Sequence, residues 1–182
     1  MIYQLAGDYY VRSIRESDLE GSYPSWFEDQ EVCKYNSHGK FFRNADWLRE
    51  FYDGLNREDQ VVWAICHEVD GHIGNISLQN ISLINRNAEF AILIGNQNHW
   101  RKSVALNASR TLIQHGFEKL NLERIYCGTA SGNFGMQRLA LRLGMAQEGR
   151  RRKHLFLEGG WQDMVEYGVL RDDFLDLKGT QK

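Results

Sequence analysis

The segment from Asn87 to Gly144 constrains the fold of this chain more than any other part of the sequence. Its pattern predicts a strand at 88–94, a basic turn at 100–103, a helix at 105–120, a strand at 124–129 and a helix at 133–143. The first turn of a helix carries backbone N–H groups that have no intrahelical partner. A strand that leads through a tight turn into a helix therefore predicts an anion-binding site at the start of that helix.

The charge of the turn at 100–103 favours this interpretation. Arg101 and Lys102 lie where the helix dipole disfavours cations, at a cost of about 0.3–1 kcal/mol each. A bound polyanion such as a pyrophosphate removes that cost. The turn therefore predicts the core of a site for a phosphate-carrying cofactor, with an ordinary solvated loop as the alternative.

Length and charge narrow the class of protein. At 182 residues the chain is most simply one domain, which we assign to residues 1–182. The formal net charge of −2 argues against a general nucleic-acid or membrane-surface binder. The sequence has neither an apolar run near the ~18 residues of a spanning helix nor a signal-peptide pattern. We therefore expect a soluble domain with no nucleic-acid or membrane partner.

The cysteines indicate the compartment. Cys33, Cys66 and Cys127 are odd in number and far apart, and the last two fall in strand-like runs. This pattern predicts buried thiols in a reducing cytoplasm. The spacing offers no close ligand pair, so we expect no metal. None of the histidines forms a triad pattern with a serine or cysteine, and we expect His99 to make a packing or loop contact.

Apolar periodicity predicts the remaining elements. They are a strand at 11–14, helices at 17–28 and 44–55, strands at 60–66 and 72–81, and a final hairpin of strands at 147–156 and 163–170. Both faces of the strand at 60–66 are apolar, which predicts an internal strand. The order of elements specifies an α/β (α+β) fold around a mixed sheet of about seven strands, with flanking helices.

Several short motifs in this order resemble one family over almost the whole chain. They are DQEV at 29–32, IGNISL at 73–78, AEF at 88–90, WRKSVALNA at 100–108, LNLERI at 120–125, Asn133, LGM at 143–145 and EG at 148–149. The chain is similar to the GNAT superfamily of acyl-CoA N-acetyltransferases, in the branch of ribosomal-protein alanine, spermidine and aminosugar acetyltransferases. The resemblance implies acetyl-CoA as co-substrate and a sheet that splays apart at the cofactor site.

The resemblance also implies roles for individual residues. Glu89 matches a strand glutamate that acts as general base, which the chemistry needs because an amine with a pKa of about 8–10 is mostly protonated at neutral pH. An ammonium-binding or inert Glu89 stays open. The implied cofactor contacts are the main chain of Ile92, Leu93 and Ile94, the helix-start residues Asn133 and Met136, and the turn residues Trp100, Arg101, Lys102, Ser103, Val104 and Ala105.

Four positions depart from the pattern of that family. Arg101 and Ser103 replace frequent glycines, which let backbone amides close on a pyrophosphate. Met136 replaces a common serine, and Ala140 stands where many relatives have the tyrosine that acts as general acid. Catalysis does not require that tyrosine, because a thiol with a pKa near 8.5 leaves readily as thiolate.

We therefore expect an acetyl-CoA-dependent N-acetyltransferase that acylates a primary amine by direct attack in a ternary complex. A protein N-terminus and a nucleotide-linked aminosugar are close rivals as acceptor. The basic run at 150–154 slightly favours the aminosugar, unless it is a solvated edge strand. Spermidine would need carboxylates such as Glu28, Asp29 and Glu31. The alternative is a catalytically degenerate module that binds CoA or senses a ligand. A homodimer is common in the resembled family and stays open here.

Overall fold

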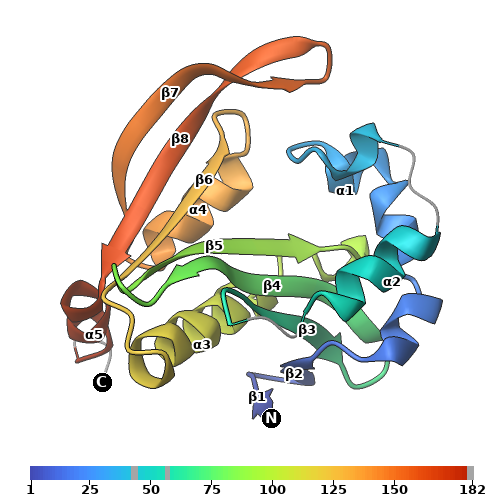
Figure 1. Ribbon diagram of the computed structural model, residues 1–182, viewed down its shortest axis with the longest axis horizontal. Helices are drawn as coiled ribbons and strands as arrows, with labels where there is room; N and C mark the ends of the chain where they lie inside the picture. The colour runs from blue at the N-terminus through green and yellow to red at the C-terminus, as the bar shows by residue number, and fades with distance from the viewer. Residues whose placement is uncertain (42–44, 56–57, 180–182) are drawn as a thin grey trace.

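One eight-stranded mixed sheet forms the centre of the computed structural model, which describes residues 1–41, 45–55 and 58–179 (Figure 1). The strands lie in the order β1-β2-β3-β4-β5-β6-β8-β7, and β5 and β6 are the parallel pair. They are β1 (Ile2–Gln4), β2 (Tyr9–Ser13), β3 (Val61–His67), β4 (Gly71–Ser82), β5 (Asn87–Ile94), β6 (Arg124–Ala130), β7 (Ala146–Leu157) and β8 (Gly160–Leu170). The predicted α/β class is confirmed. Strand β1, which the sequence analysis missed, raises the count to eight.

Helices cover both faces of this sheet. They are α1 (Gln30–Cys33), α2 (Ala45–Asp53), α3 (Val104–Lys119), α4 (Phe134–Arg142) and α5 (Arg171–Gly179), with 3-10 helices η1 (Glu16–Glu20), η2 (Pro24–Phe27), η3 (His38–Lys40) and η4 (Gln97–His99). Helix α3 packs on one face of β3 to β5, and α2 and η2 pack on the other. In the described part of the chain, no helix is both long and apolar enough to cross a membrane.

The two helices of the central segment agree with the prediction. Helices α3 and α4 begin and end within one residue of the expected bounds. Asn133 is the N-cap of α4, since its Oδ1 accepts a hydrogen bond of 3.1 Å from the N–H of Met136. Gly144 follows the helix with φ of 81°, a left-handed conformation that suits glycine.

The helix predicted at 17–28 is wrong. Two short 3-10 helices, η1 and η2, replace it, because Pro24 lacks an N–H and its ring disfavours a helix that continues through it. Asp18, expected as a cap of that helix, is buried instead. Its carboxylate accepts two hydrogen bonds of 2.7 Å from Arg12 and one of 2.7 Å from the Arg15 N–H.

The second predicted helix, at 44–55, is α2. Its expected first residue, Asn44, lies outside the described residues.

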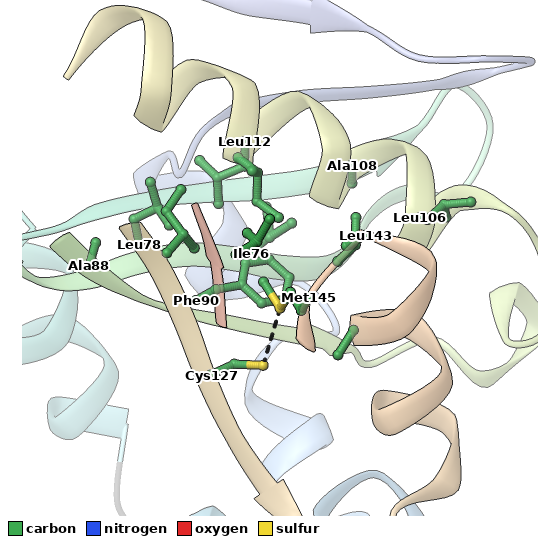
Figure 2. Close-up of a cluster of buried hydrophobic side chains, with 14 of the residues drawn as sticks. Ile76, Leu78, Ala88, Phe90, Leu106, Ala108, Leu112, Cys127, Leu143 and Met145 are labelled. Carbon is green, nitrogen blue, oxygen red and sulfur yellow. Dashed lines mark hydrogen bonds between the residues drawn. The ribbon is translucent and has the colours of Figure 1, made fainter. Parts of the chain in front are cut away.

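The main core fills the space between the sheet and helices α3 and α4 (Figure 2). Ile76 and Leu78 of β4 and Phe90 of β5 meet Leu112 of α3, and each is 2% exposed or less. Burying a side chain of this size contributes about 1.5–3 kcal/mol. Cys127 lies in the same core, with its Sγ 3.6 Å from Met145 Sδ.

Two predictions about β3 and the cysteines are confirmed. Strand β3 lies between β2 and β4, and its apolar residues contact the core on both faces. Cys66 and Cys127 are buried, and Cys33 is half-buried; all three carry free thiols. The short helix α1 and the C-terminal helix α5 were missed.

The sheet divides between β5 and β6. These strands pair at three positions only, Asn87 with Arg124, Ala88 with Ile125 and Glu89 with Tyr126. Beyond Glu89, β5 stays paired with β4 up to Ile94, whereas β6 stays paired with β8. Figure 1 shows β6, β7 and β8 turning away from β5 beyond this point. We call this place the strand split.

Candidate active site

The main chain of β5 offers an unpaired edge at the strand split. The Gly95 N–H donates to the Ile73 carbonyl of β4, and the Leu93 carbonyl also points toward β4, where it would lie 2.5 Å from a Cβ on Gly74. Because backbone groups alternate along a strand, those of Ile92 and Ile94 point toward the split. Of the three residues expected to bind a cofactor arm through their main chain, two therefore face the right way and Leu93 does not.

Trp100 occupies part of that edge. Its indole Nε1 donates a hydrogen bond of 2.8 Å to the Ile94 carbonyl. That contact leaves the Ile92 N–H and carbonyl, and the Ile94 N–H, as the edge groups nearest the turn at 100–103. The side chains of Ile92 and Ile94 pack on the main core, and that of Leu93 packs with Trp26 on the other face.

Glu89 lies where the strand split begins. Its side chain projects from the face opposite α3, on the same side as Ala91 and Leu93. Asn80 Nδ2 donates a hydrogen bond of 2.9 Å to Glu89 Oε2. Asn80 has φ of 53° within the bulge that interrupts β4 between Gln79 and Ser82. Bulges of this kind re-aim a side chain beside a functional site, and this one aims Asn80 at the carboxylate.

Tyr126 is a neighbour of Glu89 that the sequence analysis did not identify. The two residues are partners in the β5–β6 pair and share the same face of the sheet. Burial, and then the nearby Glu89 carboxylate, raise the pKa of the Tyr126 phenol. The Arg124 guanidinium carbon lies 5.8 Å from the ring centroid of Tyr126 and is itself paired with Glu148. A carboxylate and a phenol therefore stand side by side at the split.

The turn before α3 exposes a cluster of polar groups. Trp100, Arg101, Lys102 and Ser103 are exposed, whereas Val104 is buried. Among the described residues, no side chain caps the first turn of α3, although Ser103 occupies the N-cap position. The first amides of the helix therefore have no side-chain partner, and they follow directly on the exposed Ser103, with Ala105 half-buried.

The two glycine replacements in this turn differ in their backbone conformation. Ser103 has φ of −72°, which any residue adopts easily. Arg101 has φ of 61°, the left-handed region that favours glycine. The missing glycine therefore carries a conformational cost at Arg101 and none at Ser103.

The start of α4 shows what the other departures do. Met136 is half-buried near the Asn133 cap. Ala140 is fully buried against the main core, so nothing at that position reaches the split. The tyrosine that acts as general acid in many family members therefore has no counterpart at this position of α4.

The basic run at 150–154 is a sheet edge whose charges are partly compensated. Strand β7 ends the strand order, as the edge interpretation predicts. Arg150 bonds to Asp163 at 2.6 Å and Arg151 to Glu166 at 2.5 Å. Two of the guanidinium groups therefore already have acidic partners on β8.

A hollow of about 350 Å³ lies beside Asn80, on the same face as Glu89. It is lined by Glu50, Phe51, Gly54, Asp59, Gln60, Gln79 and Asn80. It is a shallow hollow that is open to solvent. Two carboxylates in its wall, from Glu50 and Asp59, suit a cationic group.

The sequence matches the model of a known family. A family model described as an acetyltransferase (GNAT) domain matches residues 9–146. The chain belongs to the GNAT acetyltransferase family. It is an N-acetyltransferase that depends on acetyl-CoA. Its mixed sheet and flanking helices are those of the GNAT fold.

Two similar proteins support the same family assignment. The chain is 32% identical over 130 residues to "Putative ribosomal N-acetyltransferase YdaF" of Bacillus subtilis (strain 168). The aligned region covers 71% of this chain and 67% of that protein. Over 152 residues it is 31% identical to a spermidine N(1)-acetyltransferase of Vibrio cholerae serotype O1, which covers 83% of this chain and 81% of that enzyme.

A solved GNAT structure shares the fold. The crystal structure of spermidine N-acetyltransferase from Vibrio cholerae in complex with CoA and spermine has a TM-score of 0.83 at 23% identity. The likeness covers 92% of this chain and 98% of that one. At this identity it supports the GNAT architecture of the present chain.

The residues of this GNAT chain fit acetyl-CoA at the strand split. The uncapped amides at the start of α3, the Ser103 hydroxyl and the Arg101 and Lys102 side chains lie on one turn, and donors of this kind suit an anion. The free edge of β5 at Ile92 leads from that turn toward Glu89. The donors therefore run from a phosphate-binding end to a carboxylate at the other end.

Proposed function

We propose that this GNAT enzyme acetylates a primary amine, with Glu89 as the general base. The observation that carries the proposal is the place of Glu89, at the point where β5 and β6 separate and within 2.9 Å of the amide of Asn80. The Glu89 carboxylate accepts the hydrogen bond from Asn80 on one oxygen. Its second oxygen stays available for a proton of the substrate ammonium. The deprotonated amine then attacks the thioester carbonyl directly, the C–S bond breaks as the C–N bond forms, and CoA leaves as its thiolate.

The chain supplies binding and orientation, and acetyl-CoA supplies the activated acyl group. We assign the diphosphate to the turn at 100–103 with the amides of Val104 and Ala105, and the pantetheine arm to the edge of β5 at Ile92 and Ile94. Main-chain donors and acceptors on a strand edge bind an extended ligand without side-chain specificity. Asn133 and Met136 lie across the split on α4, where they complete the proposed cofactor contacts.

A protein N-terminus is our preferred acceptor. The basic run at 150–154 favours an aminosugar nucleotide as acceptor, because it could bind the anionic part of that substrate. The ion pairs of Arg150 and Arg151 with β8 weaken this argument. YdaF, named for ribosomal N-acetylation, is among the relatives above 30% identity. An α-amine needs only the base and a short extended peptide behind it.

A polyamine is the second candidate because of the hollow beside Asn80. Glu50 and Asp59 could receive the distal ammonium groups of an acceptor whose reacting amine lies at Glu89. The carboxylates near α1 are less suited. Asp29 accepts from the amides of Glu31 and Val32 and from Gln97, and Glu31 pairs with Lys34.

The base role is tested with Glu89→Gln in a thiol-release assay. We expect turnover at neutral pH to fall about 10²- to 10⁴-fold, with the affinity for CoA unchanged. Glu20→Gln, an exposed change on η1, is the matched control and should keep full activity. An unchanged pH–rate profile in Glu89→Gln would remove the carboxylate from the reaction.

Asn80→Gly tests how Glu89 is positioned. Glycine keeps the left-handed backbone at this site and removes the amide that bonds to Glu89. We expect kcat to fall while KM for acetyl-CoA stays the same. A loss confined to KM would contradict the positioning role.

Ser103→Glu tests the turn as the diphosphate site. The added charge should repel CoA, while the helix dipole stabilises a carboxylate at this end by about 0.3–1 kcal/mol. Affinity by calorimetry and stability in urea should therefore change in opposite directions. Ser103→Ala is the neutral control at the same position. Equal CoA affinity in the glutamate variant would place the diphosphate elsewhere.

The same assays separate the enzyme from a degenerate module. A panel of an N-terminal peptide, spermidine and an aminosugar nucleotide should give thiol release with at least one acceptor. CoA binding without thiol release from any amine would support the ligand-sensing alternative. Retention of that binding would still support the turn and the strand split.

The remaining parts of the proposal concern the whole chain. We propose that residues 1–182 form one acyl-CoA N-acyltransferase domain that works in the cytoplasm, supported by the three free thiols. The homodimer stays a prediction. Light scattering coupled to gel filtration checks it.

A further inference from the structure

Two histidines and an aspartate that are distant in sequence meet outside the proposed active site. His67 ends β3, Asp70 lies in the turn to β4, and His99 ends η4. Asp70 Oδ2 lies 3.1 Å from His67 Nδ1 and 3.0 Å from His99 Nε2. The three ligand atoms all lie within 4.8 Å of one another. We call these residues the His-Asp-His cluster.

We propose that the His-Asp-His cluster binds a divalent transition-metal ion such as Zn²⁺. Zinc bonds to histidine nitrogen at about 2.0–2.1 Å and to carboxylate oxygen at about 2.0–2.2 Å. Two ligands of a tetrahedral ion are then roughly 3.3–3.5 Å apart. The two measured separations, 3.0 and 3.1 Å, need only a small opening to reach that value.

The hydrogen bonds of His67 favour a cation in the cluster. The Asp70 backbone N–H donates to His67 Nδ1 at 3.3 Å. A ring nitrogen that accepts this bond carries no proton, so it has none to give to the Asp70 carboxylate. The Asp70 carboxylate oxygen at 3.1 Å therefore meets no donor on this nitrogen, and the two electron-rich atoms repel each other. A metal ion that takes the single lone pair of Nδ1 in place of the Asp70 N–H, and that also bonds to the carboxylate oxygen, removes this repulsion.

Tyr9 provides the support that a ligating histidine usually has. Its hydroxyl lies 2.9 Å from His99 Nδ1, the nitrogen opposite the one that faces Asp70. With a metal on Nε2, His99 carries its proton on Nδ1 and donates it to Tyr9. Such outer contacts fix the tautomer and the ring orientation of a ligand. The His99 residue is 2% exposed, so its ring is held in one position.

The donor set defines the class of ion. Two imidazoles and one carboxylate suit Zn²⁺, Co²⁺, Ni²⁺ or Cu²⁺, whereas Mg²⁺ and Ca²⁺ prefer oxygen ligands alone. Three protein ligands leave a fourth position for water. The Asp70 side chain is 46% exposed, which gives the ion access from solvent. The nearby Lys102 ammonium opposes a cation, and the Asp70 carboxylate compensates for it.

A bound ion would tie two separate segments together. The cluster joins the β3–β4 turn to η4, and η4 leads directly into the turn at 100–103. The ion would therefore hold the loop that precedes α3. Because the unfolded chain does not assemble the three ligands, binding stabilises the folded state.

The test uses the full chain without a histidine tag, freed of metal by a chelator. Zn²⁺ affinity is measured by competition with a chromogenic chelator, and the visible spectrum of added Co²⁺ reports the coordination. We expect one equivalent to bind, and Tm to rise by about 5–10 °C at a Zn²⁺ concentration 100 times Kd. His67→Gln and Asp70→Asn should each weaken binding at least tenfold.

Two further variants make the result specific. Tyr9→Phe removes the outer hydrogen bond and should weaken binding by about 10- to 100-fold while all three ligands remain. His154→Gln, an exposed histidine on β7, should leave affinity unchanged. The proposal is overturned if the wild-type chain shows no saturable binding, or if Asp70→Asn binds as tightly as the wild type. The cluster would then be a hydrogen-bond chain only.

Discussion

Arg101 carries a backbone conformation that a sequence pattern can locate only through the glycine it replaces. Motif comparison indicates two absent glycines, at Arg101 and Ser103, and gives them equal weight. The structure separates them, because only Arg101 has a positive φ, of 61°. A left-handed conformation costs a residue with a Cβ about 1–2 kcal/mol. The side chain at this position therefore has a structural cost, which its charge toward a bound diphosphate can offset.

Arg101→Gly should stabilise the free protein despite the loss of a side chain. Relief of the left-handed strain outweighs the greater chain entropy of glycine, so we expect the free energy of unfolding to rise by up to about 1 kcal/mol. Lys102→Gly, at the next residue and without a positive φ, should lower it by about 0.5–1 kcal/mol. Urea denaturation measures both. Equal destabilisation by the two variants would contradict the strain at Arg101.

At the scale of elements, η2 is held against the end of β5 by a close approach of ring and backbone. A Cβ added at Gly95 would lie 1.9 Å from the Trp26 ring. Trp26 in turn packs with Tyr23 and His72. The absence of a side chain at Gly95 therefore sets the position of the helices that cover this face of the sheet.

Gly95→Ala should displace Trp26 and loosen η2. Overpacking of this severity costs about 1–3 kcal/mol or more, and tryptophan fluorescence should shift as the ring becomes exposed. Gly135→Ala, near the start of α4, is the control, because its nearest neighbour would lie at an ordinary 3.6 Å. It should leave stability unchanged or raise it by up to about 1 kcal/mol. A neutral Gly95→Ala would show that Trp26 has room to move.

Elements with local signals could be predicted, and those set by distant contacts could not. Helices α3 and α4 have an apolar period and, in α4, a cap and a stop glycine, so their bounds follow from the sequence. The segment at 16–27 has an equally good apolar period, and Tyr23 and Trp26 are indeed buried. Its helix fails because Pro24 interrupts it and Arg12 engages Asp18. Strand β1 has three residues and, in the described part of the chain, pairs with β2 alone, so its pattern is too short to detect.

At the scale of the whole molecule, the buried histidines make stability depend on pH. Burial lowers the pKa of His72 and of His115, whose Nδ1 bonds to the Tyr3 hydroxyl at 3.0 Å. In the unfolded chain both titrate near 6.5. Between the folded pKa and 6.5 the unfolded state binds more protons, so stability falls as pH decreases through that range.

The free energy of unfolding should therefore be lower at pH 5 than at pH 7. Burial alone would raise the pKa of Asp18, but hydrogen bonds from Arg12 and Arg15 outweigh it and lower that pKa. The stability that Asp18 contributes is present above about pH 4 and is lost below it, so it does not act in this range. Urea denaturation in the presence of a chelator measures the slope. His115→Phe keeps the packing against Trp63 and should reduce the pH dependence; an equal slope would exclude His115 as a cause.

The residues of the candidate site that lie on one continuous sequence motif could be predicted, and the others could not. Glu89 and the turn at 100–103 belong to the segment whose strand, turn and helix are read in sequence order. Asn80 and Tyr126 reach Glu89 only through the β4 bulge and the β5–β6 register, neither of which has a local signature. The His-Asp-His cluster likewise depends on η4 meeting the β3–β4 turn.

The short union of β5 and β6 has a mechanical consequence. Three residue pairs join the two halves of the sheet. Beyond these pairs, strands β5 and β6 are no longer paired with each other. An extended molecule laid against Ile92 would act as the missing strand and bind the halves together. Amide hydrogen exchange at Ile92 and along the adjoining β6 should then slow together when CoA is added.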